Sequence, residues 1–112
     1  MDELSLGLAD LDLRDGAHLV RVRGEVDIAT APAFRGALLH HTEGDVHVDL
    51  SDVSFMDSSG LSVLLSAHKA VGVRGSQLIV HGATGAVLRT MEITGMHEVL
   101  NLNGQAPTPI DD

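Results

Sequence analysis

The stretch VDLSDVSFMDSSGL, residues 48–61, joins two hydrophobic periods through a polar turn. Before the turn, apolar and polar residues alternate over Val46–Leu50, which predicts a strand with one buried face. After the turn, leucines recur at helical spacing and no proline interrupts residues 59–71, which predicts a helix. The segment Asp57–Ser59 consists of helix-capping residue types, so the boundary between strand and helix is expected there.

The start of this predicted helix has a chemistry of its own. The first backbone N–H groups of a helix lack intrahelical partners and carry the positive end of the helix dipole. A serine hydroxyl at this position is expected to be exposed and able to carry an anion. An ordinary helix cap is the alternative interpretation, because capping sequences of this kind are common.

The motif FMDSSGL, residues 55–61, resembles the phosphorylation-site signature of the STAS-domain anti-sigma factor antagonists. The segment Gly24–Asp27 and the strand before the motif belong to the same resemblance, which covers about residues 4–103. In that family a partner kinase, which is also the anti-sigma factor, phosphorylates the serine directly after the aspartate. The resemblance implies that this serine is Ser58. Ser59 is not the expected acceptor, because the family often has serine or threonine there.

The resemblance also implies a partner-binding surface. It places Asp27 near the phosphoacceptor, where an acidic residue helps the kinase interaction; the alternative is an ordinary loop residue before a helix. Asp57 can hydrogen-bond backbone N–H groups or orient the Ser58 hydroxyl, and Gly60 permits close approach of another backbone. The expected partner-binding residues are Asp27, Asp57, Ser58, Ser59, Gly60 and Leu61.

Composition restricts the function classes. With 112 residues, 44% of them apolar, the chain is expected to form one globular domain. The net charge of -9 and the absence of Trp and Tyr argue against nucleic-acid binding. There is no cysteine, and no apolar run is long enough for a signal peptide or a membrane span. A cytoplasmic protein that binds neither nucleic acid nor membrane is therefore expected.

The rest of the chain predicts an α/β domain. A first strand over residues 4–13, with a bulge or end near Asp10, and a second strand from His18, ended by Gly24, form a hairpin. A helix capped by Thr30 follows, with Phe34, Ala37, Leu38 and His41 on one face.

Further along, residues 77–81 predict a strand and residues 82–85 open a helix, while residues 99–102 are a short last strand or a hydrophobic tuck. We expect a single STAS-like domain over 1–112, with a core of about 4–103 and a flexible tail over 104–112. Its small mixed sheet begins with the antiparallel hairpin, continues as β-α repeats, and carries its helices mainly on one face.

The same residues allow other kinds of site, namely a hydrolase active site, a phosphate-binding loop and a metal site. A serine hydrolase would fit Ser58 on a strand-to-helix turn, but the Gly-x-Ser-x-Gly pattern is absent and the domain offers little room for a substrate cleft. The turn Gly82–Gly85 lacks the remaining features of a phosphate-binding loop. His40 and His41 are expected on different faces of a helix, so neither a metal nor a cofactor is predicted, and the chain is not expected to be an enzyme.

The function implied by the resemblance is a protein-binding switch. The unphosphorylated protein binds a GHKL-type anti-sigma factor serine kinase and thereby releases a sigma factor, and phosphorylation of Ser58 switches it off. A PPM-type serine phosphatase resets the switch. The alternative is a STAS module that binds its partner constitutively in a lipid-transport or transporter complex.

Overall fold

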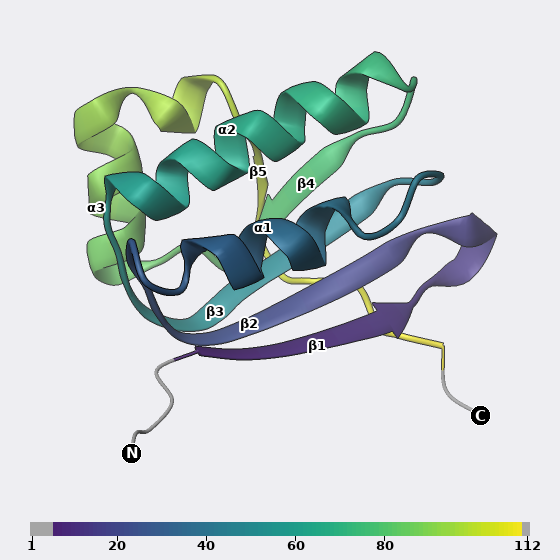
Figure 1. Cartoon of the computed structure of the whole chain (residues 1–112), viewed down its shortest axis with the longest axis horizontal. Helices are drawn as coiled ribbons and strands as arrows, with labels where there is room; N and C mark the ends of the chain where they lie inside the picture. Colours follow the sequence, from purple (N-terminus) through teal and green to yellow (C-terminus); the bar gives the residue numbers. More distant parts are fainter. Residues whose placement is uncertain (1–5, 111–112) are drawn as a thin grey trace.

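A five-stranded mixed sheet with helices over one face forms the domain in residues 6–110, the part of the chain that the computed structural model describes (Figure 1). The strands lie in the order β1-β2-β3-β4-β5, with β1 antiparallel to β2 and every later neighbour parallel. This arrangement confirms the predicted fold class. The elements are β1 (Leu6–Asp12), η1 (Arg14–Gly16), β2 (His18–Val26), α1 (Ala31–Leu39), β3 (Val46–Met56), α2 (Ser58–Val73), β4 (Leu78–His81), α3 (Gly85–Thr94), η2 (Met96–Glu98) and β5 (Asn101–Asn103).

The first hairpin differs from the prediction in two details. Pairing between β1 and β2 runs without interruption from Leu6 to Asp12, so of the predicted bulge or end near Asp10 there is no bulge, and the strand ends two residues later, at Asp12. Leu4 lies outside the described residues. Gly24 was expected to end the second strand, but β2 continues to Val26. Gly24 has φ 105, and the register against β3 shifts between Gly24 and Glu25, so the glycine produces a local irregularity while the neighbouring strand keeps β2 paired.

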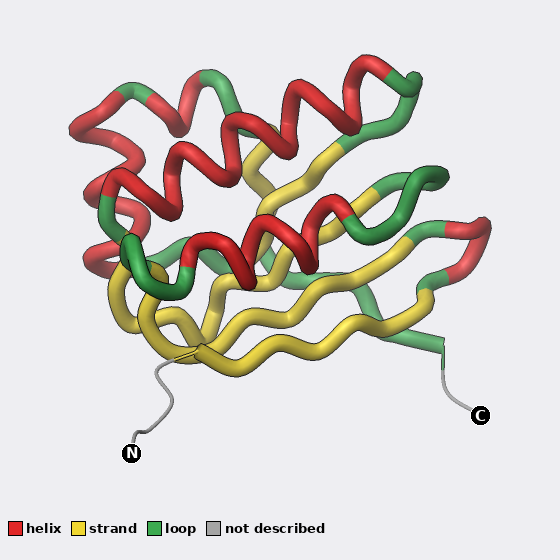
Figure 2. Tube along the Cα trace, in the orientation of Figure 1, coloured by secondary structure: helices red, strands yellow, loops and turns green. Residues whose placement is uncertain are grey.

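The main core lies between the sheet and helices α1 and α2, which run side by side over one face (Figures 1 and 2). Phe34 and Leu38 of α1 and Leu64 of α2 have no exposed surface, as the helical periods predicted, and Ala67 of α2 is fully buried as well. Helix α1 ends at Leu39, however, so His41 lies in the turn before β3 and not on the helix face where it was expected.

The segment after β5 crosses back along the sheet. Gly82 N–H donates to the carbonyl oxygen of Gly104 at 2.9 Å, and Ile110 N–H donates to that of Asp12 at 3.0 Å. Leu19 and Ile79 are buried outside the main core, which fits a small second apolar layer on the sheet face opposite the helices. The flexibility predicted for this tail stays a prediction, but residues 104–110 do not extend away from the domain.

The last strand resolves an alternative that the sequence left open. Residues Asn101–Asn103 pair in parallel with β4, so the end of the domain is a strand and not only a hydrophobic tuck. None of the helices within residues 6–110 is long and apolar enough to cross a lipid bilayer.

Candidate functional site

The loops after β2 and β3 meet at the carboxyl edge of the sheet. Val26 is the register partner of Met56, so the next residues, Asp27 and Asp57, leave the sheet side by side. The backbone N–H of Asp57 also donates to the carbonyl oxygen of Val26 at 3.1 Å. Parallel pairing thus brings together two acidic residues that are 30 positions apart in the chain, as the resemblance implied.

Asp57 is the N-cap of α2. Its backbone is extended (φ -98, ψ -169), and its Oδ1 accepts a hydrogen bond of 2.8 Å from the backbone N–H of Ser59. The capping role that the sequence allowed for Asp57 is therefore confirmed. Its carboxylate also places a negative charge at the positive end of the α2 dipole.

Ser58 is the first residue of α2, and it is exposed. Ser59 is half-buried, and its backbone N–H is taken by the Asp57 carboxylate. The structure therefore presents Ser58 to solvent at a helix N-terminus, the location at which an anion is favoured.

Gly60 and Leu61 lie beneath this surface. A Cβ on Gly60 would approach Met56 Cγ to 2.5 Å and Val26 Cγ1 to 2.8 Å, both too short for real contacts. The close approach expected at Gly60 therefore involves side chains of its own domain and not the backbone of a partner. Leu61 is only 5% exposed and belongs to the core. These two residues can shape a partner surface only by positioning the start of α2.

Asp27 lies in the turn before α1. Its Oδ1 accepts hydrogen bonds from the backbone N–H groups of Ala29 (3.0 Å) and Thr30 (3.1 Å), while Asp27 N–H donates to Thr30 Oγ1 (2.9 Å). This reciprocal pair has the arrangement of a capping box. Thr30 is the N-cap of α1 and a proline stands in the first turn, as predicted. Its side chain makes no cap hydrogen bond, however, because Thr30 Oγ1 is turned back toward Asp27 and Glu25.

Two exposed apolar side chains flank the acidic pair, and the sequence analysis did not assign them to the site. Ile28, directly after Asp27, is 80% exposed, and Phe55, two residues before Asp57, is 45% exposed. An isoleucine in a polar loop after a strand was the available signal for Ile28. Exposed apolar side chains around a polar centre are typical of protein-binding surfaces.

Histidines gather at two places away from this edge. His47 Nδ1 and His81 Nε2 form a hydrogen bond of 2.8 Å on the sheet face that the tail crosses, and burial lowers the pKa of both side chains. His18 and His41 stack beside Asp10 at the other end of the sheet. Neither group was predicted, because each joins residues that are distant in the sequence.

Comparison with known proteins fits this fold and this edge. The family model described as "Mlab, STAS domain" matches residues 9–102. The chain belongs to the STAS-domain family of anti-sigma factor antagonists. The anti-sigma-B factor antagonist of Listeria monocytogenes is 39% identical over 93 residues, which cover 80% of this chain and 82% of that protein.

Solved STAS structures share the same architecture. An anti-sigma factor antagonist from Mycobacterium paratuberculosis superposes with a TM-score of 0.78 at 30% identity, covering 93% of this chain and 87% of that one. The unphosphorylated anti-sigma factor antagonist SpoIIAA superposes with a TM-score of 0.75 at 16% identity, covering 89% of each chain, and that likeness concerns the fold alone. The family resemblance read from the FMDSSGL motif is thereby confirmed.

Proposed function

We propose that this STAS domain is an anti-sigma factor antagonist that binds an anti-sigma factor serine kinase through the carboxyl edge of β2 and β3. Binding would release the sigma factor that the kinase otherwise holds. The observation that carries the proposal is the exposed Ser58 on the first turn of α2, beside exposed Ile28 and Phe55. The name of the Listeria relative, an anti-sigma-B factor antagonist, supports the sigma-factor context.

The proposed switch is phosphorylation of Ser58 by a GHKL-type kinase. A phosphate adds about 1.5 to 2 negative charges at pH 7. At a packed interface those charges must be desolvated, and they lie close to the carboxylates of Asp27 and Asp57. A penalty of about 3 kcal/mol weakens binding roughly a hundredfold, which is sufficient for a kinase to exchange partners. A PPM-type serine phosphatase would restore the binding form.

The different roles of the acidic residues and of the serine within the site also support a binding switch. The Asp27 carboxylate bonds the turn before α1 and the Asp57 carboxylate caps α2, so the two side chains hold two loops in place around the acceptor. Ser58 is left as the exposed group that a kinase can reach. We therefore assign Ser58 the role of substrate for another protein's catalysis.

The deciding experiment incubates the purified chain with its cognate kinase and ATP and maps the phosphopeptide. One phosphate on Ser58 is expected, with Ser59→Ala labelled like the wild type and Ser58→Ala unlabelled. Calorimetry should then find that Ser58→Ala binds the kinase while the phosphoprotein binds roughly a hundredfold more weakly. Phosphate on Ser59 alone would refute the assignment of the acceptor. Equal binding of both forms would favour the constitutive STAS module instead.

A further inference from the structure

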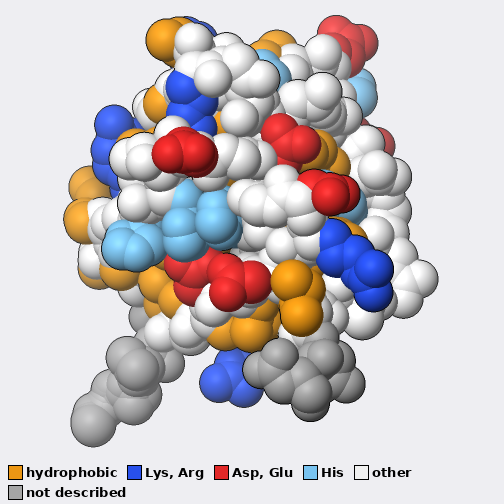
Figure 3. Space-filling model, turned by 90° about the vertical axis from the view of Figure 1, so that its right-hand side faces the viewer, with side chains coloured by type: hydrophobic (Ala, Val, Ile, Leu, Met, Phe, Trp, Pro, Cys, Tyr) orange, Lys and Arg blue, Asp and Glu red, His pale blue; other side chains and the backbone are white. Residues whose placement is uncertain are grey.

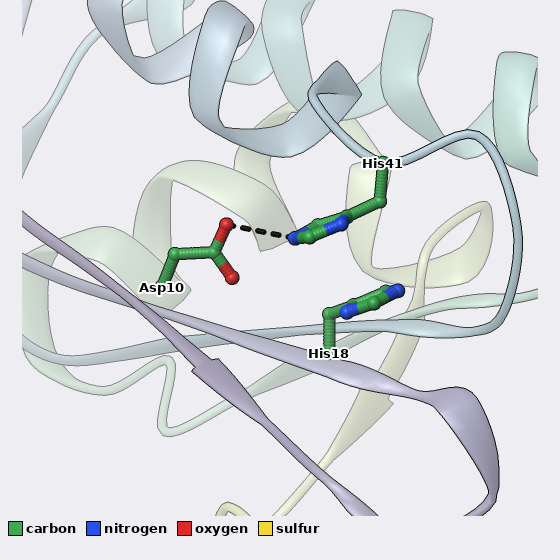
Figure 4. Close-up of side chains that lie close together, drawn as sticks. All are labelled: Asp10, His18 and His41. Atoms are coloured by element: carbon green, nitrogen blue, oxygen red, sulfur yellow. Dashed lines mark hydrogen bonds and ion pairs between the residues drawn. The ribbon is translucent and has the colours of Figure 1, made fainter.

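A second site lies at the end of the sheet opposite Ser58. Asp10 of β1, His18 of β2 and His41 of the α1–β3 turn each offer one ligand atom, and these three atoms lie within 4.8 Å of one another (Figure 4). This end of the molecule faces the viewer in Figure 3, where histidine side chains gather next to acidic ones. We propose that these three residues form a binding site for a divalent transition metal, and that Zn²⁺ is the ion that fits them best.

The strand register explains why three of the groups share one face. Asp12 and His18 are direct cross-strand partners in the β1–β2 hairpin. Asp10 is two residues from Asp12, and side chains two residues apart point to the same side of a strand. A hairpin thus gathers two carboxylates and one imidazole, and the turn before β3 adds His41 from above (Figure 4).

One ring nitrogen of His18 has a lone pair that is free to bind a metal. Its Nε2 lies 3.0 Å from the carbonyl oxygen of Glu43, and because a carbonyl only accepts hydrogen bonds, Nε2 must donate. In the neutral ring Nδ1 then holds a free lone pair. That Nδ1 is buried without a hydrogen-bond partner among the described residues. A metal-ligating histidine typically donates its other N–H to a backbone carbonyl in this way, which fixes the tautomer and the ring orientation.

His41 is held in place by its own turn. Arg74 donates hydrogen bonds to the carbonyl oxygens of His41 (3.1 Å) and Gly44 (2.7 Å), so its guanidinium spans the turn. The ring of His41 stacks on that of His18 with centroids 3.5 Å apart and planes 2° from parallel. Its Nε2 lies 2.7 Å from Asp10 Oδ2, and because an ionised carboxylate only accepts hydrogen bonds, this nitrogen donates and must give up its proton when it binds a metal. The backbone that carries these ligands is therefore fixed before any ion binds.

The donor set matches zinc in number and type. Two imidazoles and a carboxylate are common zinc ligands, with bonds of about 2.0–2.2 Å, and they leave a fourth position open. Asp12 lies outside the group of three, but its carboxylate is 83% exposed and its Oδ1 is 3.9 Å from His18 Nδ1, so either Asp12, after a side-chain rotation, or a water molecule would fill that position. Tetrahedral ligand atoms lie about 3.3 Å apart, so the Asp10–His41 pair must open by roughly half an ångström and the rings must tilt. Because parallel rings cannot both aim a lone pair at one ion, the stack must open; Asp10 is exposed and His41 lies on a turn, so these two side chains would move.

A bound zinc ion would cross-link the first hairpin to the turn that leads into β3. Zinc there would join β1, β2 and the α1–β3 turn without touching the edge that carries Ser58. The site is therefore expected to stabilise the domain and to leave phosphorylation of Ser58 unchanged. This independence separates the inference from the proposed function.

The test is calorimetric titration of the EDTA-treated full chain with ZnCl2. We expect one equivalent with a dissociation constant of about 10 µM or tighter. Zinc at about a hundred times that constant should raise the thermal midpoint by roughly 10 °C. In long-range ¹H–¹⁵N spectra, zinc should shift Nδ1 of His18 and Nε2 of His41, the two nitrogens that the geometry assigns.

Variants distinguish this site from other histidines. Asp10→Asn and His41→Gln should each lose at least about 100-fold in zinc affinity, because even outer-shell partners of a ligand are worth about 10–100-fold. The neighbouring His40→Gln is the matched control and should bind like the wild type. Circular dichroism without zinc checks folding, which should persist because Arg74 bonds the backbone of the turn. Binding that survives both variants, binding lost in His47→Gln instead, or no binding at all would overturn the proposal.

Discussion

Asp57 N–H donates to the carbonyl oxygen of Val26 at 3.1 Å, and this bond joins the loop that carries the acceptor serine to the loop that carries Asp27. It extends the parallel pairing of β2 and β3 by one step beyond the last register pair, Val26 and Met56. The two loops therefore form one connected surface. Their geometry depends on how closely α2 approaches the ends of both strands.

The first prediction concerns that close approach. Gly60→Ala should lower the free energy of unfolding by about 1–3 kcal/mol, because the new methyl group overlaps Met56 and Val26 and forces the start of α2 away from the sheet. Gly36→Ala is the matched control in α1, where a Cβ meets nothing within 4 Å. It should raise the free energy of unfolding by about 0.5–1 kcal/mol. Urea denaturation measures both, and equal stabilisation by the two alanines would contradict the packing argument.

The second prediction separates the two uses of Asp57. Asp57→Ala removes the acceptor for Ser59 N–H and should lower the free energy of unfolding by about 1 kcal/mol. Asp57→Asn keeps an oxygen in the same place and should retain most of that stability. If Asp57→Asn is stable but binds the kinase poorly, the charge itself contacts the partner. If Asp57→Asn is as unstable as Asp57→Ala, capping is not what the side chain supplies.

The third prediction tests the reciprocal bonds between Asp27 and Thr30. Asp27→Ala and Thr30→Val should each destabilise the domain by about 1 kcal/mol, and the double variant should lose less than the sum, because both single changes break the same pair. Thr84→Val is the control, since Thr84 is the N-cap of α3 and makes no side-chain cap bond. Additive losses in the double-mutant cycle would show that the two side chains act independently.

Much of this fold could be predicted from periodicity, and the reason is local. The alternation over Val46–Leu50 and the helical spacing after Ser59 record which side of each element faces the core, so the order and type of the elements follow. The position of the acceptor serine followed in the same way from the junction between the two periods. Such features can be predicted because each depends only on residues that are close together in the sequence.

The remaining features depend on contacts between distant residues. Part of the requirement for glycine at position 60 comes from Val26, which is distant in the sequence, and the rest comes from Met56. The His18–His41 stack joins a strand to a turn. The hydrogen-bonded turn between Asp27 and Thr30 was not predicted, although the Thr30 N-cap and the following proline were. Residue spacing along the sequence does not reveal contacts of this kind, because they depend on how distant segments pack.

The fourth prediction is a loss of stability in acid. Burial lowers the pKa of His47 and His81 below the ordinary value of 6.5, so below pH 6.5 the unfolded chain binds protons that the folded chain does not. The free energy of unfolding should therefore fall as the pH drops below 6.5, by at most about 1.4 kcal/mol per pH unit for each histidine. Thermal midpoints measured from about pH 7.5 to about pH 5 test the effect, because this range brackets the ordinary pKa of histidine.

A variant checks the origin of this acid sensitivity. His47→Asn should reduce the pH dependence, because it removes one of the two titrating rings and relieves the charge effect of His47 on His81. His40→Asn, an exposed neighbour of the helix end, serves as the control and should keep the wild-type slope. An unchanged slope in His47→Asn would place the sensitivity elsewhere in the domain.

The last prediction asks if the switch at Ser58 acts locally. A charge on the first residue of α2 interacts with the helix dipole, and an anion there is worth about 0.3–1 kcal/mol at low salt, partly offset by repulsion from Asp57. Phosphorylated Ser58 should therefore leave the thermal midpoint within about 5 °C of the unmodified protein. Ser58→Glu should be the most stable variant, Ser58→Ala intermediate and Ser58→Lys the least stable. The differences between their thermal midpoints should shrink at about 1 M salt, where charges are screened over about 3 Å. If phosphorylation lowered the midpoint by more than about 10 °C, the modification would act by unfolding the domain, and repulsion at an intact interface would no longer explain the release of the partner.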